Sequence, residues 1–80
     1  MPILHRGALV GRLDAKAHRS DGVFEVKALY LEPGVRVTQR LIADLSAALI
    51  RCSAWHGTER VAIEYCDPAA LKRSLKAALK

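Results

Sequence analysis

Four basic side chains recur along the most regularly alternating part of the chain, where they could bind phosphate. Arg12 and Lys16 lie in one alternating run, Arg19 follows it, and Lys27 lies in the next run. Successive side chains of a strand point to opposite faces, so a hairpin of the two runs gathers cations on one face. A two-stranded ribbon of this kind fits a DNA groove or follows the phosphates. The alternative is an ordinary solvated sheet face, on which Lys and Glu are common.

Residues that hold metals or act as nucleophiles are few and scattered. Cys52 and His56 are four residues apart on a predicted helix and Cys66 lies further on, but this spacing matches no standard zinc site and a fourth ligand is missing. Buried, unreactive thiols are the preferred interpretation. His5 and His18 lie on other elements, and no glycine-rich phosphate loop or nucleophile elbow is present. We therefore expect no metal, no cofactor and no catalysis.

The elements that carry these side chains begin with a predicted three-stranded meander over residues 2–5, 8–18 and 23–32. Asp21-Gly22 suits the two-residue loop of a tight hairpin, because these residues tolerate a positive φ. In that register Lys16 lies opposite Lys27, which sets two like charges face to face. The inward face is expected to hold Leu9, Leu13, Ala15, Ala17, Phe24, Val26, Ala28 and Tyr30.

Three apolar residues near the base of this hairpin fall on its outward face. They are Val10, Leu29 and Leu31. An exposed apolar patch marks a contact with something else, so the pattern predicts an interaction surface that covers a neighbouring domain or a second copy. An unprotected edge strand in so small a sheet also favours self-association.

Two helices and one more strand complete the pattern. Thr38 is a suitable N-cap for a helix that ends near residue 56, where a glycine follows. Residues 61–65 alternate as a last strand, and Asp67-Pro68 is typical of the start of a final helix. The outer side of that helix carries Lys72, Arg73, Lys76 and Lys80, as soluble amphipathic helices commonly do.

The resulting order is β-β-β-α-β-α, an α+β fold in which a small antiparallel-rich sheet carries two helices mainly on one face. Residues 1–80 are expected to form a single domain. If the last strand runs parallel to a neighbour across the long helix, the crossover should be right-handed.

Composition is compatible with a soluble protein that contacts nucleic acid, although the positive charge is spread over both halves of the chain. The 13 Lys and Arg residues outnumber the 8 Asp and Glu residues, which gives a formal net charge of +5. No apolar run approaches the length of a membrane span, and the N-terminus lacks the pattern of a signal peptide. A cytoplasmic location and no membrane partner are therefore expected.

Most of the chain resembles the C-terminal region of a bacterial winged-helix family that includes DNA glycosylases acting on interstrand crosslinks and bulky alkylated purines. The resemblance lies in LVGRLDAKAHR (residues 9–19), LYLEPGV (residues 29–35) and WHGTERVAIEYC (residues 55–66). It implies a C-terminal domain beside winged-helix modules of a DNA-repair enzyme. The family's catalytic signature is a glutamine, an apolar residue, then a glutamine or aspartate. Here the only glutamine, Gln39, precedes Arg40 and Leu41, so no position inherits that role.

Two functions from different classes are expected. The first is a non-catalytic accessory domain of a DNA-repair glycosylase-like winged-helix protein, which contacts duplex DNA weakly, in a salt-dependent way, through Arg12, Lys16, Arg19 and Lys27. The second is a structural or interaction module without direct DNA contact. It would dock on winged-helix domains of the same or a companion chain, or form a homodimer.

Overall fold

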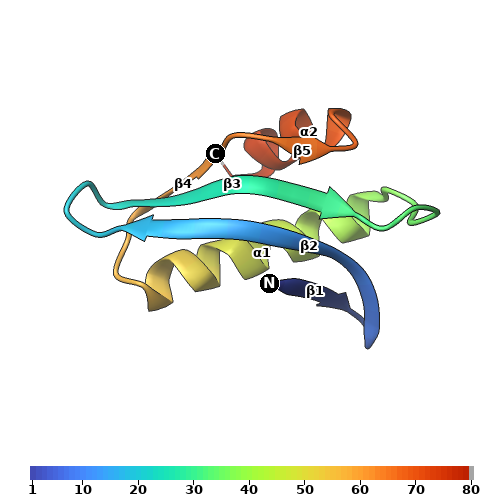
Figure 1. Ribbon diagram of the computed structural model, residues 1–80, viewed down its shortest axis with the longest axis horizontal. Helices are drawn as coiled ribbons and strands as arrows, with labels where there is room; N and C mark the ends of the chain where they lie inside the picture. The colour runs from blue at the N-terminus through green and yellow to red at the C-terminus, as the bar shows by residue number, and fades with distance from the viewer. Residues whose placement is uncertain (80) are drawn as a thin grey trace.

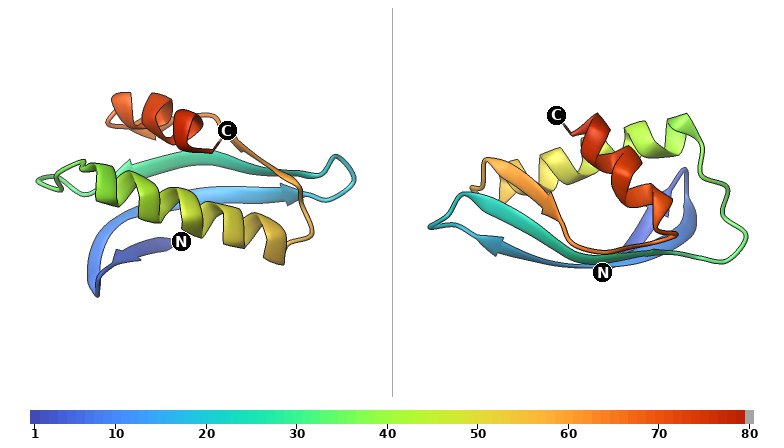
Figure 2. Two further views of the ribbon diagram at one scale, coloured as in Figure 1. Left: turned by 180° about the vertical axis from the view of Figure 1, so that it is seen from behind. Right: turned by 90° about the horizontal axis from the view of Figure 1, so that it is seen from above.

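Both helices pack on one face of a five-stranded sheet, and the opposite face is uncovered (Figure 1; Figure 2, right). The computed structural model describes residues 1–79. In chain order the elements are β1 (Pro2–His5), β2 (Ala8–His18), β3 (Val23–Leu31), α1 (Gln39–Trp55), β4 (Arg60–Ile63), β5 (Cys66–Asp67) and α2 (Ala70–Ala78). The α+β class and the single helical layer agree with the sequence pattern. The predicted last strand over residues 61–65 corresponds to β4, which ends at Ile63, and the sequence pattern missed β5.

The sheet combines an antiparallel meander with two short parallel strands. Its order is β1-β2-β3-β4, and β5 pairs with the second half of β3. The meander of β1, β2 and β3 is antiparallel, while β4 and β5 run parallel to β3. Seen from the helical side (Figure 2, left), the chain passes from β3 through α1 to β4 in the right-handed sense expected of such a crossover.

The hairpin between β2 and β3 has a longer turn than the sequence predicts. Residues 19–22 form it, and its last residue, Gly22, has a φ of 70°. Near the turn the register is shifted by two residues from the predicted one, which leaves the faces unchanged but sets Lys16 opposite Glu25. The predicted pairing of Lys16 with Lys27 is therefore wrong, and the repulsion it implied does not arise.

A β-bulge at Lys27 then changes which side chains of β3 face the core. The neighbours of Lys27 in β3 pair with consecutive residues of β2, so Lys27 has no partner in the ladder. The extra residue shifts the alternation of inward and outward side chains by one position. Val26 and Leu29 therefore both point into the core, and each is 0% exposed. Tyr30, which the sequence pattern places inward, lies on the uncovered face instead.

A register irregularity in β2 at Val10 makes a second change of face. Gly11 pairs with Ile3 and Leu9 pairs with Leu4, so Val10 has no partner in β1, and β2 bends at this point. A Cβ on Gly11 would lie 2.2 Å from the carbonyl oxygen of Tyr30, so only glycine permits this approach of the two backbones. Val10 and Leu13, on either side, are both buried. Leu9, which the alternation places inward, is 53% exposed. Figure 1 shows β2 curving at its beginning toward β1.

The predicted interaction surface is consequently part of the core. Val10 and Leu29 belong to the buried hydrophobic cluster, and Leu31 is half-buried against it. The bend and the bulge bring these side chains inward, where burying each one contributes about 1.5–3 kcal/mol. The apolar residues exposed at this end are Leu4 and Leu9, which pair across β1 and β2.

Helix α1 begins where the sequence predicts. Thr38 is the N-cap, and its Oγ1 accepts a hydrogen bond from the amide of Leu41 at 3.0 Å. The helix ends at Trp55, with His56 as the C-cap and Gly57 beyond it at a φ of 73°. Its inner stripe consists mainly of Leu41, Leu45 and Leu49.

Helix α2 begins later than predicted. Asp67 is the last residue of β5, so it pairs with β3 and does not cap a helix. The helix starts at Ala70 without a side-chain cap. Leu71 and Leu75 are its buried residues, and they attach it to the same core as α1.

Candidate nucleic-acid interface

The uncovered face of the sheet carries three of the four predicted phosphate-binding residues. Leu13 and its inward neighbours in β2 pack against the core, so Arg12 and Lys16 point away from it. Lys27 follows the fully buried Val26 and projects to the same side. All three cationic side chains are exposed.

Two tyrosines join Arg12 on this face. The Arg12 Cζ atom lies 5.0 Å from the centroid of the Tyr30 ring, which is a favourable cation–π geometry. The ring centroids of Tyr30 and Tyr65 are 5.7 Å apart, and the rings are tilted by 54°. The sequence pattern missed this cluster because it placed Tyr30 in the core. Only the bulge, which pairs Arg12 with Tyr30, brings the three side chains together.

Carboxylates share the face with these cations. The Oε1 atom of Glu25 lies 2.8 Å from Nε2 of His18, and this hydrogen bond is the main reason that the pKa of Glu25 is lowered. Nearby Lys27 lowers that pKa further, so Glu25 is ionised at neutral pH. The other acidic residues that alternation and strand pairing place on this face are Asp14, Glu64 and Asp67. The cations are thus interleaved with negative charge, which limits how strongly the face attracts a polyanion.

Arg19 is not brought together with the other three. Its Nε donates a hydrogen bond to the carbonyl oxygen of His56 at 3.0 Å, so the guanidinium points to the helical side of the sheet. There it lies at the carboxyl end of α1, where a positive charge is favourable. Arg19 therefore joins the turn of the hairpin to α1 and is not a member of the sheet-face cluster.

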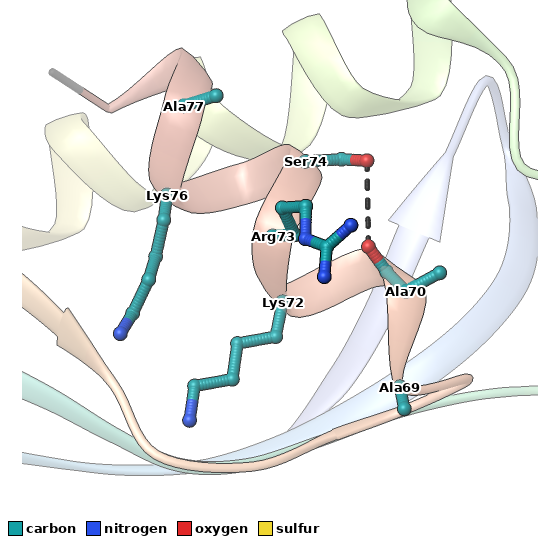
Figure 3. A pocket seen from close by; sticks show the side chains of 7 residues that line it. All are labelled: Ala69, Ala70, Lys72, Arg73, Ser74, Lys76 and Ala77. Atoms are coloured by element: carbon teal, nitrogen blue, oxygen red, sulfur yellow. Dashed lines mark hydrogen bonds between the residues drawn. The ribbon is translucent and has the colours of Figure 1, made fainter.

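A second basic surface lies on α2. Lys72, Arg73 and Lys76 line a shallow depression, and Figure 3 shows the two lysines extending side by side from successive turns. The other residues that line it are Ala69, Ala70, Ser74 and Ala77. No carboxylate is among the described residues that line this depression, so its positive charge is more concentrated than that of the sheet face. The sequence pattern indicated only the solvent-exposed side of a helix for these residues and for Lys80, which lies outside the described residues.

The histidines and cysteines either join elements of the fold to one another or are buried within it. The Nε2 atom of His5 lies 2.7 Å from Oδ2 of Asp44, which joins β1 to α1 and is the main cause of the lowered pKa of Asp44. Burial raises the pKa of the Cys66 thiol, which disfavours the reactive thiolate. Among residues 1–79, no group of three or more potential ligands is placed to hold a metal ion.

No protein-family model matches this chain, and no solved structure matches it. Within residues 1–79, no helix has both the length and the apolar character needed to cross a bilayer.

Proposed function

We propose that this chain is a non-catalytic accessory domain that contacts duplex DNA weakly through the uncovered face of its sheet. The observation that carries the proposal is the cluster of Arg12, Tyr30 and Tyr65, flanked by Lys16 and Lys27. The resemblance to winged-helix DNA glycosylases supports the same assignment. On this proposal, winged-helix domains of the same or a companion chain supply the rest of the DNA contact.

The geometry favours contact with the phosphate backbone. The ring of Tyr30 supports the Arg12 guanidinium from one side, which leaves its N–H donors for a phosphate oxygen. The interleaved carboxylates lower the affinity, so the domain alone should bind weakly. Each phosphate that is neutralised adds about 0.9 to the slope of log affinity against log salt, so three contacts give a slope of about −3.

Fluorescence anisotropy with a labelled random-sequence duplex at several salt concentrations tests the proposal. The sheet triple variant combines Arg12→Ala, Lys16→Ala and Lys27→Ala. The helix triple variant, its matched control, combines Lys72→Ala, Arg73→Ala and Lys76→Ala. Both changes lower the formal net charge from +5 to +2, so a general loss of attraction affects them alike.

The sheet triple variant should lose most of the binding and nearly all of its salt dependence, whereas the helix triple variant should keep most of both. The opposite ranking would transfer the DNA contact to α2 and overturn the proposal. Absence of binding by the unmodified chain at low salt would also overturn it.

A second candidate function is an interaction module, favoured by the exposed pair of leucines at the edge of the sheet. Leu4 is 69% exposed and Leu9 is 53% exposed, and the two face each other across β1 and β2. The free edge of β1 offers unpaired backbone groups beside them. A neighbouring winged-helix domain or a second copy could cover this patch.

Sedimentation velocity over a wide range of concentration tests the self-associating form. We expect a dimer that Leu4→Glu disrupts, while Ile50→Glu, at an apolar position on α1 that is 51% exposed, leaves it intact. A monomer at the highest concentration would remove the homodimer.

A further inference from the structure

The carboxyl end of α1 presents an exposed tryptophan that neither the sheet face nor α2 involves. Trp55 is the only tryptophan of the chain, and it is 86% exposed. Large aromatic side chains are usually at least partly buried in a folded domain. Its indole is therefore available to a ligand on nearly its whole surface.

The backbone that carries Trp55 is held rigidly. The Oγ1 atom of Thr58 donates to the carbonyl of Ser53 at 2.7 Å, and the two hydroxyl oxygens lie 2.8 Å apart, all of them buried. The ring of His56 packs against Phe24 at 5.3 Å between centroids, and its Nδ1 lies 2.8 Å from the carbonyl oxygen of Cys52. The end of the helix is thus fixed, so ordering it on binding costs little.

Two arginines lie near the end of α1 that carries Trp55. Arg51 lies one helical turn before Trp55 on the same exposed face. Arg19 reaches the adjacent carbonyl of His56 with only its Nε, which leaves its terminal nitrogens available. The one acidic residue of α1, Asp44, forms ion pairs with His5 and Arg40. Positive charge beside Trp55 is therefore not compensated from α1 itself.

The surroundings distinguish a nucleobase from a protein partner. A stable protein interface buries about 800 Å² on each side, mostly around an apolar centre. On its face of α1, Trp55 is preceded by Arg51 one turn away and by Ala47 two turns away. Two carboxylates lie at this end of the molecule, that of Asp21 in the hairpin turn and that of Glu59 just before β4. The side chain of Arg60 donates a hydrogen bond to the backbone carbonyl oxygen of Asp21 at 3.5 Å.

A single aromatic ring with adjacent cations is the arrangement that stacks an unpaired base and holds its phosphate. We propose that Trp55, Arg51 and Arg19 form a stacking site for an unpaired nucleobase of single-stranded nucleic acid. The site is separate from the sheet face and does not depend on the duplex contact proposed there.

Intrinsic fluorescence tests this site directly, because all tryptophan emission comes from Trp55. Titration with a short oligothymidylate should quench the emission, whereas a blunt duplex or inorganic polyphosphate at equal phosphate concentration should quench it little. With a labelled oligothymidylate, anisotropy should show about a tenfold or greater loss of affinity for Trp55→Ala and a smaller loss for Trp55→Phe. Arg51→Ala should reduce the salt slope by about 0.7.

Arg36→Ala is the matched control, since it removes an exposed arginine before the other end of α1 and should change nothing. The sheet triple variant should retain the quenching, and Trp55→Ala should retain duplex binding, so the two proposals fail separately. Equal quenching by polyphosphate would indicate simple anion binding and overturn the stacking site. A change of emission on dilution of the protein alone would indicate self-contact and overturn it as well.

Discussion

The two ends of the β2–β3 hairpin differ in how regularly their side chains alternate between the two faces of the sheet. Near the turn, strict alternation holds, and Phe24 and Val26 face the core as their spacing predicts. Toward the base, the bulge at Lys27 exchanges the faces of β3, so Leu29 is buried and Tyr30 is on the uncovered side. The irregularity at Val10 likewise exchanges the faces of β2. A single unpaired residue therefore decides which aromatic side chain can meet a ligand.

The difference also explains where the candidate site lies. At the turn end, Lys16 faces Glu25, and His18 holds the same carboxylate, so the charges there largely satisfy one another. At the base end, Arg12 packs on Tyr30. The irregular end of the ribbon, and not the regular one, provides the cluster that can bind.

Replacing Leu29, the inward residue at the base of the β2–β3 hairpin, should have the largest effect on stability. Leu29→Ala should lower the free energy of unfolding by about 3 kcal/mol, because it opens a cavity in the centre of the core. Tyr30→Ala should cost only about 1 kcal/mol, because that ring is partly exposed. Urea unfolding followed by circular dichroism measures both, and a larger loss for Tyr30→Ala would refute the bulge.

Adding a side chain at Gly11 should have the next largest effect on stability. Gly11→Ala should cost about 2 kcal/mol or more, since the new Cβ would collide with the backbone of β3. Gly7→Ala is the control, because Gly7 has a φ of 81° but open space around it, and about 1 kcal/mol is expected. Equal losses of stability for Gly11→Ala and Gly7→Ala in thermal unfolding would mean that β2 and β3 do not approach each other closely at Gly11.

The ion pairs at the two ends should give a smaller, pH-dependent effect. The pKa of Glu25 lies below its ordinary 4.5 and that of Asp44 below its ordinary 3.8, chiefly because of hydrogen bonds from His18 and His5. Each carboxylate therefore adds stability above its ordinary pKa, and this stability is lost as the pH falls through the lowered folded value.

The melting temperature should accordingly fall as the pH is lowered from neutral to below these values. Glu25→Gln removes the contribution from the turn end, and Asp44→Asn removes the one that joins β1 to α1. Each single variant should show a weaker pH dependence than the unmodified chain, and the double variant the weakest. An unchanged pH profile in the double variant would show that neither pair contributes.

Neutralising carboxylates on the sheet face should change DNA affinity least. Removing one repelling charge about 10 Å from a phosphate should raise duplex affinity by about twofold. Asp67→Asn should gain more than Glu64→Gln, since Asp67 lies directly opposite Tyr30 of the binding cluster, whereas Glu64 lies at the level of Val26. Glu59→Gln, which lies off this face, is the control, and anisotropy at low salt measures all three.

The amino-acid sequence alone determined the kind and order of most elements. Periodicity and local chemistry suffice for this, as Thr38 at the start of α1 and Gly57 after its end show. The positively charged residues and the outward direction of Arg12 and Lys16 were also evident from alternation. These features depend on neighbours within a few residues, which a linear sequence displays.

Only the tertiary structure decided the register, the bulge at Lys27, the irregularity at Val10 and the presence of β5. Asp67 was predicted to cap α2 but pairs with β3, and Val10 was predicted to be exposed but enters the core. Each outcome depends on how distant segments share one small core, where burial outweighs a local preference by a kilocalorie or two. For the same reason the exposed position of Trp55 and the direction of Arg19 could be found only once β2, α1 and β4 were placed together.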